Sequence, residues 1–360
     1  MKKLLKGIGV VILAMVILFA GLIATFTLLR VYDRHQQRKH VEAMKVDDDA
    51  SHDEQAFVSF DLGTDPRLNE IQVVATHNSY KKHPTKLGMM LVELYEKGGS
   101  HELRYGHTTL SEQFDSGVRS IELDVRSQSG RLELNHVPLV DNRATCPDFA
   151  LALKEITIWS KNHPGHVPIM VLVELKSDWK ELAPFMDAVD LAMLDRMDEV
   201  IRDVIPKEQL LTPDDVRQEG KTLQQSITED GWPKLSEVQG KIMIILHAHP
   251  VLAEYHKAHE SLEGCAMFTS AREEDRGSVV LLKNDPSNAV IPELVSKNYL
   301  VRTRADADLM VDEELAKVAV ASGAQIISTD YPPGEPDADG YVFAFDEGKT
   351  VQINHPACRD

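Results

Sequence analysis

The stretch Pro168-Ile-Met-Val-Leu-Val-Glu-Leu-Lys176 decides the fold class of this 360-residue chain. It is an apolar run of strand length, rich in branched residues, and it becomes charged only at its end. A strand without a polar face belongs in a parallel sheet covered by helices, because neither of its faces can meet water. Such a sheet requires further apolar strands that alternate with helices along the chain.

Short apolar segments on both sides of this stretch repeat the pattern, and segments with the 3.6-residue period of helices separate most of them. Asp148 is the predicted N-cap of one helix, which ends near Pro164. The other predicted helices cover residues 87–95, 186–204 and 313–322, and the other predicted strands cover residues 71–76, 120–125, 132–136, 241–246, 278–282, 299–302 and 324–329. About eight buried strands in roughly 290 residues predict an α/β fold, with a (β/α)8 barrel of the TIM type in preference to an open doubly wound sheet. Residues 341–345 and 350–353 are predicted to form an appended C-terminal hairpin.

The N-terminus has a different character from the rest of the chain. Residues 8–29 carry no charge, and at about 1.5 Å per helical residue they cover roughly 33 Å, which is enough to cross a membrane. This stretch is longer than the apolar part of a signal peptide and lacks a small-x-small cleavage site behind it. We therefore expect an uncleaved transmembrane anchor at residues 1–30 in preference to a cleaved signal, a polar stalk at residues 31–56, and one barrel domain at residues 57–360. Basic residues flank the span on both sides in similar number, so they do not determine its orientation.

Charge and cysteine content exclude several classes of protein. The chain has a net charge of −18, and the part after residue 40 holds 32 basic and 56 acidic residues, a charge of −24. A domain this acidic repels a nucleic-acid backbone, so nucleic acid is excluded as a partner. The three cysteines, Cys146, Cys265 and Cys358, do not have the spacing of a zinc site, although Cys358 could form a disulfide with either of the others.

Polar residues gather where the predicted strands end, which is where the active site of a barrel lies. They are Thr76-His77-Asn78-Ser79-Tyr80, Glu122 and Asp124, Asn135-His136-Val137-Pro138, Glu174 and Lys176, and Thr329-Asp330-Tyr331. Residues i and i+2 of a strand share a face, so each of the pairs at 122/124 and 174/176 points to one side. Any one of these elements alone is compatible with a turn or a solvated face. Their occurrence in order on successive strands indicates one site.

The composition of this site indicates its chemistry. Carboxylates buried together need a cation to offset their repulsion, and oxygen ligands favour Ca²⁺ or Mg²⁺ over zinc. His77 and His136 are then free for proton transfer, and a cation with two histidines and a lysine suits a phosphodiester substrate. His247 and His249, with His256 and His259 nearby, could form a second metal site, although exposed helical histidines are the simpler interpretation.

Together the segments at residues 77–80, 121–126, 135–138 and 174–176 resemble the bacterial Ca²⁺-dependent phosphoinositide phospholipase C family of the barrel phosphodiesterase superfamily. The similarity runs from about residue 71 to residue 332 and includes residues 113–119, 231–233, 301–306 and 328–331. The resemblance implies a Ca²⁺ ion, with Mg²⁺ as the less suitable alternative. By the same resemblance the ligands of the ion are Asn78, Glu122, Asp124 and Glu174, the catalytic residues are His77, His136 and Glu122, and the substrate-binding residues are Lys176, Arg304 and Asp330.

The resemblance further implies cleavage of phosphatidylinositol-type lipids to diacylglycerol and a cyclic inositol phosphate, by attack of the inositol 2-hydroxyl on phosphorus. Glu122, Glu174 or His77 would accept the hydroxyl proton, and His136 would protonate the departing glycerol oxygen. The expected location is a membrane, with the catalytic domain outside the cytoplasm, in a periplasm or at a cell surface. The sequence determines neither the preferred headgroup nor the oligomeric state.

Two other functions remain open at this point. A glycerophosphodiester phosphodiesterase shares the barrel and the Glu-x-Asp pair, but it usually has His-Arg-Gly after the first strand and His-Asp after the third. Here these positions read His77-Asn78-Ser79 and His136-Val137-Pro138, which favours the phospholipase type. A catalytically inactive, membrane-tethered binding domain is the other alternative, and the competent residues at every expected catalytic position argue against it.

Overall fold

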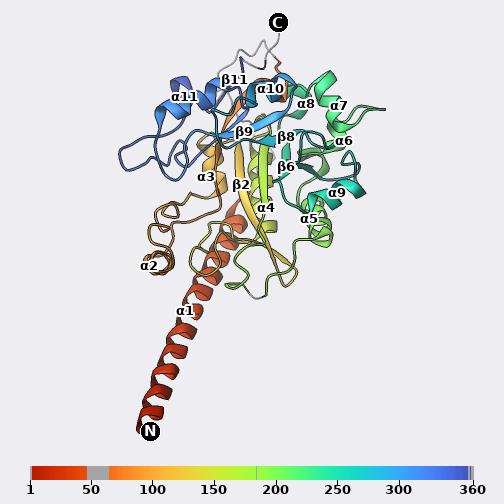
Figure 1. The fold of residues 1–360 in the computed structure, drawn as a ribbon. Coiled ribbons are helices and arrows are strands. Elements are labelled where there is room, and N and C mark those ends of the chain that lie inside the picture. The colour runs from red at the N-terminus through yellow and green to blue at the C-terminus, as the bar shows by residue number, and fades with distance from the viewer. Residues whose placement is uncertain (1, 47–64, 184, 356, 358–360) are drawn as a thin grey trace.

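The structure is a computed structural model that describes residues 2–46, 65–183, 185–355 and 357. It consists of an α/β body and a long N-terminal helix that projects from one side of it (Figure 1). A ring of parallel strands forms the centre of the body, and helices lie around this ring. The architecture is a TIM-type barrel preceded by a long apolar helix, as the sequence predicts.

In the described part of the chain, eight parallel strands make up the ring. In ring order they are β1 (Ile71–Thr76), β2 (Ser120–Gln128), β4 (Ile169–Leu175), β6 (Ile242–Leu246), β7 (Met267–Thr269), β8 (Val280–Leu282), β9 (Leu300–Arg304) and β10 (Ile326–Thr329). β10 pairs with β1, and the ring is closed between β7 and β8 by one parallel bridge from Thr269 to Ser278. Almost every strand residue is buried, which explains the near-continuous apolar runs in the sequence.

The helices around the ring follow most of the strands. They are α2 (Lys86–Tyr95), α3 (Leu110–Asp115), α4 (Phe149–Asn162), α5 (Leu191–Val204), α6 (Pro213–Val216), α7 (Leu223–Gln225), α8 (Leu235–Val238), α9 (Leu252–Ala258), α10 (Ile291–Ser296) and α11 (Glu313–Ala321). A two-residue strand, β5 (Leu210–Leu211), pairs with the start of β6. Asp148 caps α4 as predicted, because its side chain accepts a 3.1 Å hydrogen bond from the amide of Leu151.

One of the eight predicted strands is present but lies outside the ring, and one strand of the ring was not predicted. The segment predicted at residues 132–136 is β3 (Arg131–Leu134), which pairs antiparallel with β2 because Ser129 and Gly130, at φ 50° and 75°, reverse the chain. β7 takes its place in the ring, and its three residues are too few to show a period. The predicted C-terminal hairpin is also absent from the described residues. β11 (Val351–Ile353) pairs antiparallel with β1, while Phe343 and Phe345 are buried in a small apolar cluster beside α11.

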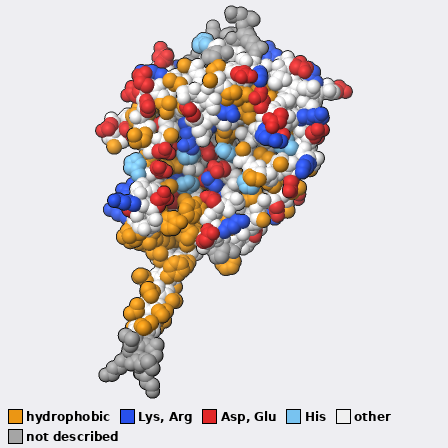
Figure 2. Space-filling model, viewed as in Figure 1, with side chains coloured by type: hydrophobic (Ala, Val, Ile, Leu, Met, Phe, Trp, Pro, Cys, Tyr) orange, Lys and Arg blue, Asp and Glu red, His pale blue; other side chains and the backbone are white. Residues whose placement is uncertain are grey.

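The N-terminal helix α1 (Lys2–Ala43) continues through the segment predicted as a stalk. The stalk prediction is wrong for residues 31–43, because Asp33, Gln37 and Val41 are buried against the barrel. Residues 47–56 lie outside the described part of the chain. By length and composition α1 can cross a membrane. Its side chains from Gly7 to Thr25 are largely exposed, as the apolar projecting helix in Figure 2 shows, and cover about 28 Å.

Packing between α3 and α4 gives a test of the barrel core. Phe114 is fully buried, and its ring lies 5.0 Å from that of Trp159 between centroids. Phe114→Ala should lower the free energy of unfolding by about 3–5 kcal/mol, through lost burial and the cavity it leaves. Denaturant unfolding of the purified protein measures the change. Val318→Ala, at an exposed position of α11, is the control and should stay within about 0.5 kcal/mol of the wild type. Equal effects in the two variants would contradict this packing.

Candidate active site

Three carboxylates from two neighbouring strands meet at the mouth of the barrel. Glu122 and Asp124 lie two residues apart on β2, and the parallel register places Asp124 directly beside Glu174 of β4. Oxygen atoms of the three side chains lie within 4.8 Å of one another. In the described ranges this is the single group of three or more metal-ligating side chains close enough to hold an ion.

The histidines that could have formed a second metal site do not do so. His247, His249, His256 and His259 make no such group in the part of the chain that the structure describes. The Nε2 atom of His256 lies 3.0 Å from the hydroxyl of Thr269 instead. This leaves the carboxylate cluster as the candidate metal centre.

The negative charges of the carboxylate cluster repel one another, and the positive charges of the protein offset this repulsion only in part. Burial raises the pKa of Asp124 to about 6, the nearby charges of Glu174 and Glu122 add to the rise, and Lys176 and His136 oppose it. The ammonium group of Lys176 lies 2.8 Å from Oε1 of Glu174 and 3.4 Å from Oδ2 of Asp124. Lys176, a predicted substrate-binding residue, therefore also neutralises the cluster.

Asn78 completes a set of oxygen donors. It follows β1 in the left-handed region, at φ 49°, which turns its side chain toward Asp124. One end of the Asn78 amide lies 2.7 Å from the hydroxyl of Tyr105, and the other end lies 3.2 and 3.3 Å from the two carboxylate oxygens of Asp124. The hydrogen bonds are best satisfied with the amide nitrogen at that second end, where it donates to Asp124, and with the oxygen accepting from Tyr105. A half-turn of the amide would present its oxygen to the carboxylates instead, and four oxygen-bearing side chains would then converge. All of them are hard donors of the kind that Ca²⁺ binds, so the residues present fit this ion.

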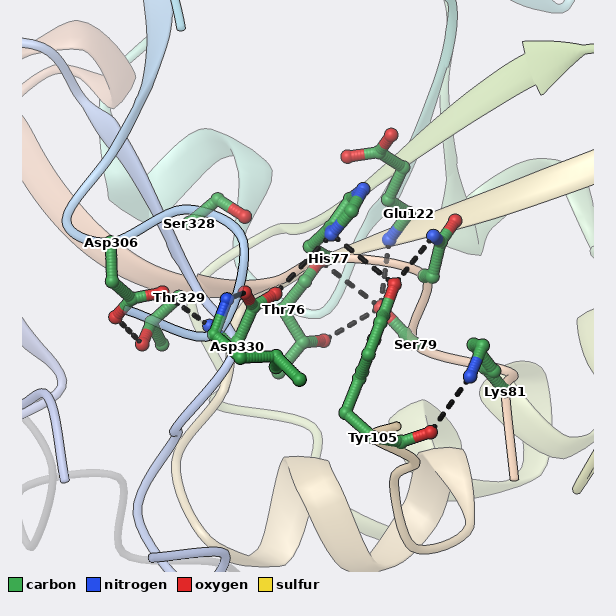
Figure 3. A network of polar contacts seen from close by, with 12 residues as sticks. Thr76, His77, Ser79, Lys81, Tyr105, Glu122, Asp306, Ser328, Thr329 and Asp330 are labelled. Carbon is green, nitrogen blue, oxygen red and sulfur yellow. Dashed lines mark hydrogen bonds and ion pairs between the residues drawn. The ribbon is translucent and has the colours of Figure 1, made fainter. Parts of the chain in front are cut away.

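Two histidines at the mouth share one arrangement. His77 follows β1, and its Nδ1 lies 3.3 Å from Oδ1 of Asp330, which follows β10 (Figure 3). His136 follows β3, and its Nδ1 lies 2.7 Å from Oδ2 of Asp141. In both cases Nε2 makes no hydrogen bond to a described residue, so each ring is oriented by a carboxylate and keeps one nitrogen free. Burial lowers the pKa of His77 although Asp330 acts against it, which favours the neutral ring.

Asp330 is itself held in place. Its amide donates a 2.7 Å hydrogen bond to Asp306, which also accepts one from the hydroxyl of Thr329 (Figure 3). Arg304, the other predicted substrate-binding residue of this region, has a buried Nε without a hydrogen-bond partner among the described residues. Its positive charge lowers the pKa of both Asp330 and Glu122. Arg304 thus presents an unsatisfied cationic group at the mouth.

Arg302 is a site residue that the sequence reasoning missed. It is fully buried on β9 and donates a 2.6 Å hydrogen bond to Oε2 of Glu122. Burial alone would raise the pKa of Glu122, but Arg302, followed by His77 and other cations, lowers it to about 2. Glu122 is therefore ionised and has one oxygen already engaged. The sequence could have identified Arg302 as a site residue, because it lies two residues before Arg304 and shares its face of the strand.

Asp141, Tyr105 and His107 were also missed. Asp141 lies five residues after His136, so its closeness in the sequence could have suggested that it contacts this histidine. Tyr105 stacks on the ring of His77 at 6.0 Å between centroids, and Nε2 of His107 lies 2.9 Å from the backbone oxygen of His77. These last two residues come from a loop about 30 residues further along the chain, so no local pattern connects them to the site.

Comparison with known proteins gives consistent findings. The model of the family described as Ca²⁺-dependent phosphoinositide phospholipase C matches residues 66–133 and 127–355. The calcium-dependent phosphoinositol-specific phospholipase C from Pseudomonas sp. superposes with a TM-score of 0.59 at 20% identity, covering 84% of this chain and 100% of that one. A Ca²⁺-dependent phosphatidylinositol-specific phospholipase C from Streptomyces antibioticus gives a TM-score of 0.54 at 19% identity, covering 73% and 94%. At these identities the structural likeness shows the fold alone. No curated protein matches the chain.

Calcium is expected to raise the thermal unfolding midpoint of the full-length protein in detergent micelles, because the carboxylate cluster that would bind it forms only in the folded protein. At a calcium concentration 100 times Kd the stabilisation is about 2.7 kcal/mol. EGTA should reverse the shift, and Mg²⁺ should give a smaller one. Asp124→Asn should remove most of the shift, whereas Glu181→Gln, at an exposed position after β4, should retain it. If the Asp124→Asn protein kept the full calcium-dependent rise in its unfolding midpoint, calcium would have to bind elsewhere.

Proposed function

The chain belongs to the Ca²⁺-dependent phosphoinositide phospholipase C family, and on that premise we propose that it cleaves phosphatidylinositol-type lipids to diacylglycerol and a cyclic inositol phosphate. Enzymes of this family are phosphodiesterases. The observation that carries the proposal is the pair of carboxylate-oriented histidines beside the carboxylate cluster. The charge of His77 acts on Glu122, and that of His136 acts on Asp124, so the two rings lie near different members of the cluster.

We assign the proton acceptor to His77. Nε2 of its neutral ring is free to take the proton of the inositol 2-hydroxyl, and Asp330 at Nδ1 stabilises the imidazolium that forms. Glu122 is a weaker base, because its pKa is about 2 and Arg302 holds one of its oxygens. Glu174 is ion-paired with Lys176. The preference for His77 thus rests on the partners that the other two candidates already have.

His136 acts as the proton donor. As the bond from phosphorus to the inositol 2-oxygen forms, the bond from phosphorus to the glycerol oxygen breaks. Nε2 of His136 protonates that glycerol oxygen, which releases diacylglycerol, while Asp141 holds the ring through Nδ1. In the reverse roles, His136 takes a proton from water that attacks the cyclic phosphate and His77 returns one to the 2-oxygen. The product is then an open inositol phosphate.

The carboxylate cluster supports this chemistry by holding Ca²⁺ through Asn78, Glu122, Asp124 and Glu174. When bound, the ion lowers the pKa of the attacking hydroxyl and offsets negative charge in the phosphorane-like transition state. Among the chain's own residues, Lys176 and Arg304 supply further positive charge for the phosphate and headgroup. Asp330, which lies beside His77, is proposed to contact the headgroup too.

Exposed apolar side chains at the mouth support a lipid substrate over a soluble diester. They come from α2 after β1 and from the loops after β4 and β9, and the most exposed are Leu94 (78%), Tyr95 (80%), Phe185 (72%) and Met310 (65%). α2 lies on the side of the body from which α1 projects (Figure 1). Figure 2 shows hydrophobic side chains gathered where α1 leaves the body, next to a recess with acidic, basic and histidine side chains. A glycerophosphodiester phosphodiesterase has no need of such a surface.

We further propose that α1 is an uncleaved anchor and that the barrel lies outside the cytoplasm, in a periplasm or at a cell surface. The support is the length and apolar composition of the helix. The membrane and the phosphodiester lipid are then the two partners of the protein. An inactive binding domain would not require the two oriented histidines.

The reaction is tested with the full-length protein in mixed micelles of phosphatidylinositol and detergent. We expect calcium-dependent formation of cyclic inositol phosphate, detected by phosphorus NMR and abolished by EGTA. His136→Ala should lower kcat by a factor of about 10²–10⁴, because the leaving oxygen loses its acid. His355→Ala, at an exposed position after β11, should behave as the wild type. A fully active His136→Ala protein would contradict the mechanism.

The lipid preference has a separate test. Tyr95→Ser and Phe185→Ser should each lower activity on phosphatidylinositol vesicles by about tenfold, because one large apolar side chain contributes at least that much to membrane affinity. Activity on soluble glycerophosphoinositol should be unchanged, and Val318→Ser on α11 is the control. An equal loss of activity on both substrates would indicate that the two side chains contribute to folding and not to lipid binding. A wild-type protein that hydrolyses glycerophosphoinositol but not vesicles would be a glycerophosphodiester phosphodiesterase.

A further inference from the structure

The second half of α1 presents one side to the barrel. Its buried residues are Phe26, Arg30, Asp33, Gln37 and Val41, spaced by three or four positions, which is the period of one helical face. Two of the five are charged, so this face of the helix contacts the barrel through polar interactions as well as apolar packing. All the partners described below, except Lys82, belong to residues 134–148, which run from the last residue of β3 to the start of α4 and include His136 and Asp141.

Arg30 is 7% exposed and hydrogen-bonds to three backbone oxygens of this segment. Nη1 donates to the oxygen of Asn142 at 3.1 Å, and Nη2 donates to that of Pro147 at 3.1 Å and to that of Leu134. A guanidinium group has a fixed fork of donors, so it holds these three positions in one geometry. The two ends of the loop are thereby tied together.

Asp33 is fully buried and holds the middle of the segment. Its oxygens accept hydrogen bonds from Arg143 at 2.6 and 2.9 Å, from the amide of Ala144 at 3.3 Å and from Lys82 at 3.0 Å. Gln37 adds a reciprocal pair with the backbone of Asp148, each bond 2.9 Å long. A carboxylate buried this deeply depends on these cations to offset its charge.

These contacts add to the few backbone hydrogen bonds that the segment makes, such as the one from the amide of Leu134 to the oxygen of Pro147 at 3.0 Å. Between β3 and α4 the chain has little regular structure, and buried backbone groups need partners. The α1 side chains satisfy three carbonyls and one amide through Arg30 and Asp33 alone. His136 and Asp141 lie between the anchored positions at residues 134 and 142. Within the loop they are held together by two backbone hydrogen bonds between Val137 and Asp141, at 3.3 and 3.1 Å, so the α1 contacts act on the position of the loop as a whole.

We infer that α1 is a positioning element of the active site, in which Arg30 and Asp33 keep the loop of His136 and Asp141 in the geometry for proton donation. The inference rests on the proposed function for the role of His136. Because docking begins at Phe26, directly after the exposed apolar part of the helix, the same contacts hold this loop where the helix enters the bilayer. The helix that anchors the protein therefore also holds the catalytic loop in position.

The test compares two soluble substrates that differ in the need for an acid, using full-length protein in detergent micelles. Glycerophosphoinositol has a glycerol leaving group that must be protonated, whereas nitrophenyl inositol phosphate releases an anion without one. For Asp33→Asn and Arg30→Met we expect kcat to fall at least tenfold on the first substrate and less than threefold on the second, with KM nearly unchanged. Glu42→Gln and Arg38→Met, at exposed positions of the same helix, should match the wild type on both.

Hydrogen exchange gives a readout that does not require activity. In Asp33→Asn, amides of residues 135–148 should exchange faster while those of β2 and β4 keep their protection. Unchanged exchange in that loop would overturn the inference, as would wild-type kcat or an equal loss on both substrates. A wild-type protein inactive on both substrates would instead count against the proposed function, and the exchange result would still decide whether α1 holds the loop.

Discussion

Three carboxylates within 4.8 Å of one another impose the constraint on which the rest of the site depends. Like charges at that distance repel strongly in a poorly hydrated barrel mouth, so positive charge must be supplied from neighbouring strands. Arg302 of β9 supplies it to Glu122, and Lys176 supplies it to Asp124 and Glu174. Even so, the pKa of Asp124 remains raised to about 6. The remaining imbalance is what a divalent cation would remove, and the oxygen donors around it suit calcium.

The barrel determines why the catalytic groups lie where they do. Parallel strands all end at the same rim, and the register of β2 with β4 sets Asp124 beside Glu174. The histidines come from the segments that follow β1 and β3, and each is oriented by a carboxylate. His77 is thus tied to β10 through Asp330, whereas His136 and Asp141 share one loop. The first pair is held by the ring itself. The second is held by Arg126 of β2, which donates to the backbone oxygen of His136, and it receives further support from outside the ring.

That support comes from α1, and it changes how the charge of the protein is understood. The domain after residue 40 has a net charge of −24, which opposes adsorption to an anionic lipid surface. If α1 is embedded in a membrane, as we propose, it would offset that repulsion whatever the charge of the domain. Because Arg30 and Asp33 are buried in the domain, a helix anchored as we propose would also fix the side of the barrel that faces the bilayer. A flexible polar stalk would have secured proximity without this orientation.

The sequence by itself determined the barrel, the apolar helix and the ordered set of polar residues at the strand ends. These features are local, since strand runs, helical periods and i, i+2 pairs are all set by neighbouring residues. Only the tertiary structure decided which residues compensate and orient one another. Arg302 meets Glu122 across 180 positions, Asp330 meets His77 across 253, and Asp33 meets Arg143 across 110. Ion pairs over such separations depend on how the ring closes and where α1 docks, and no local pattern encodes either.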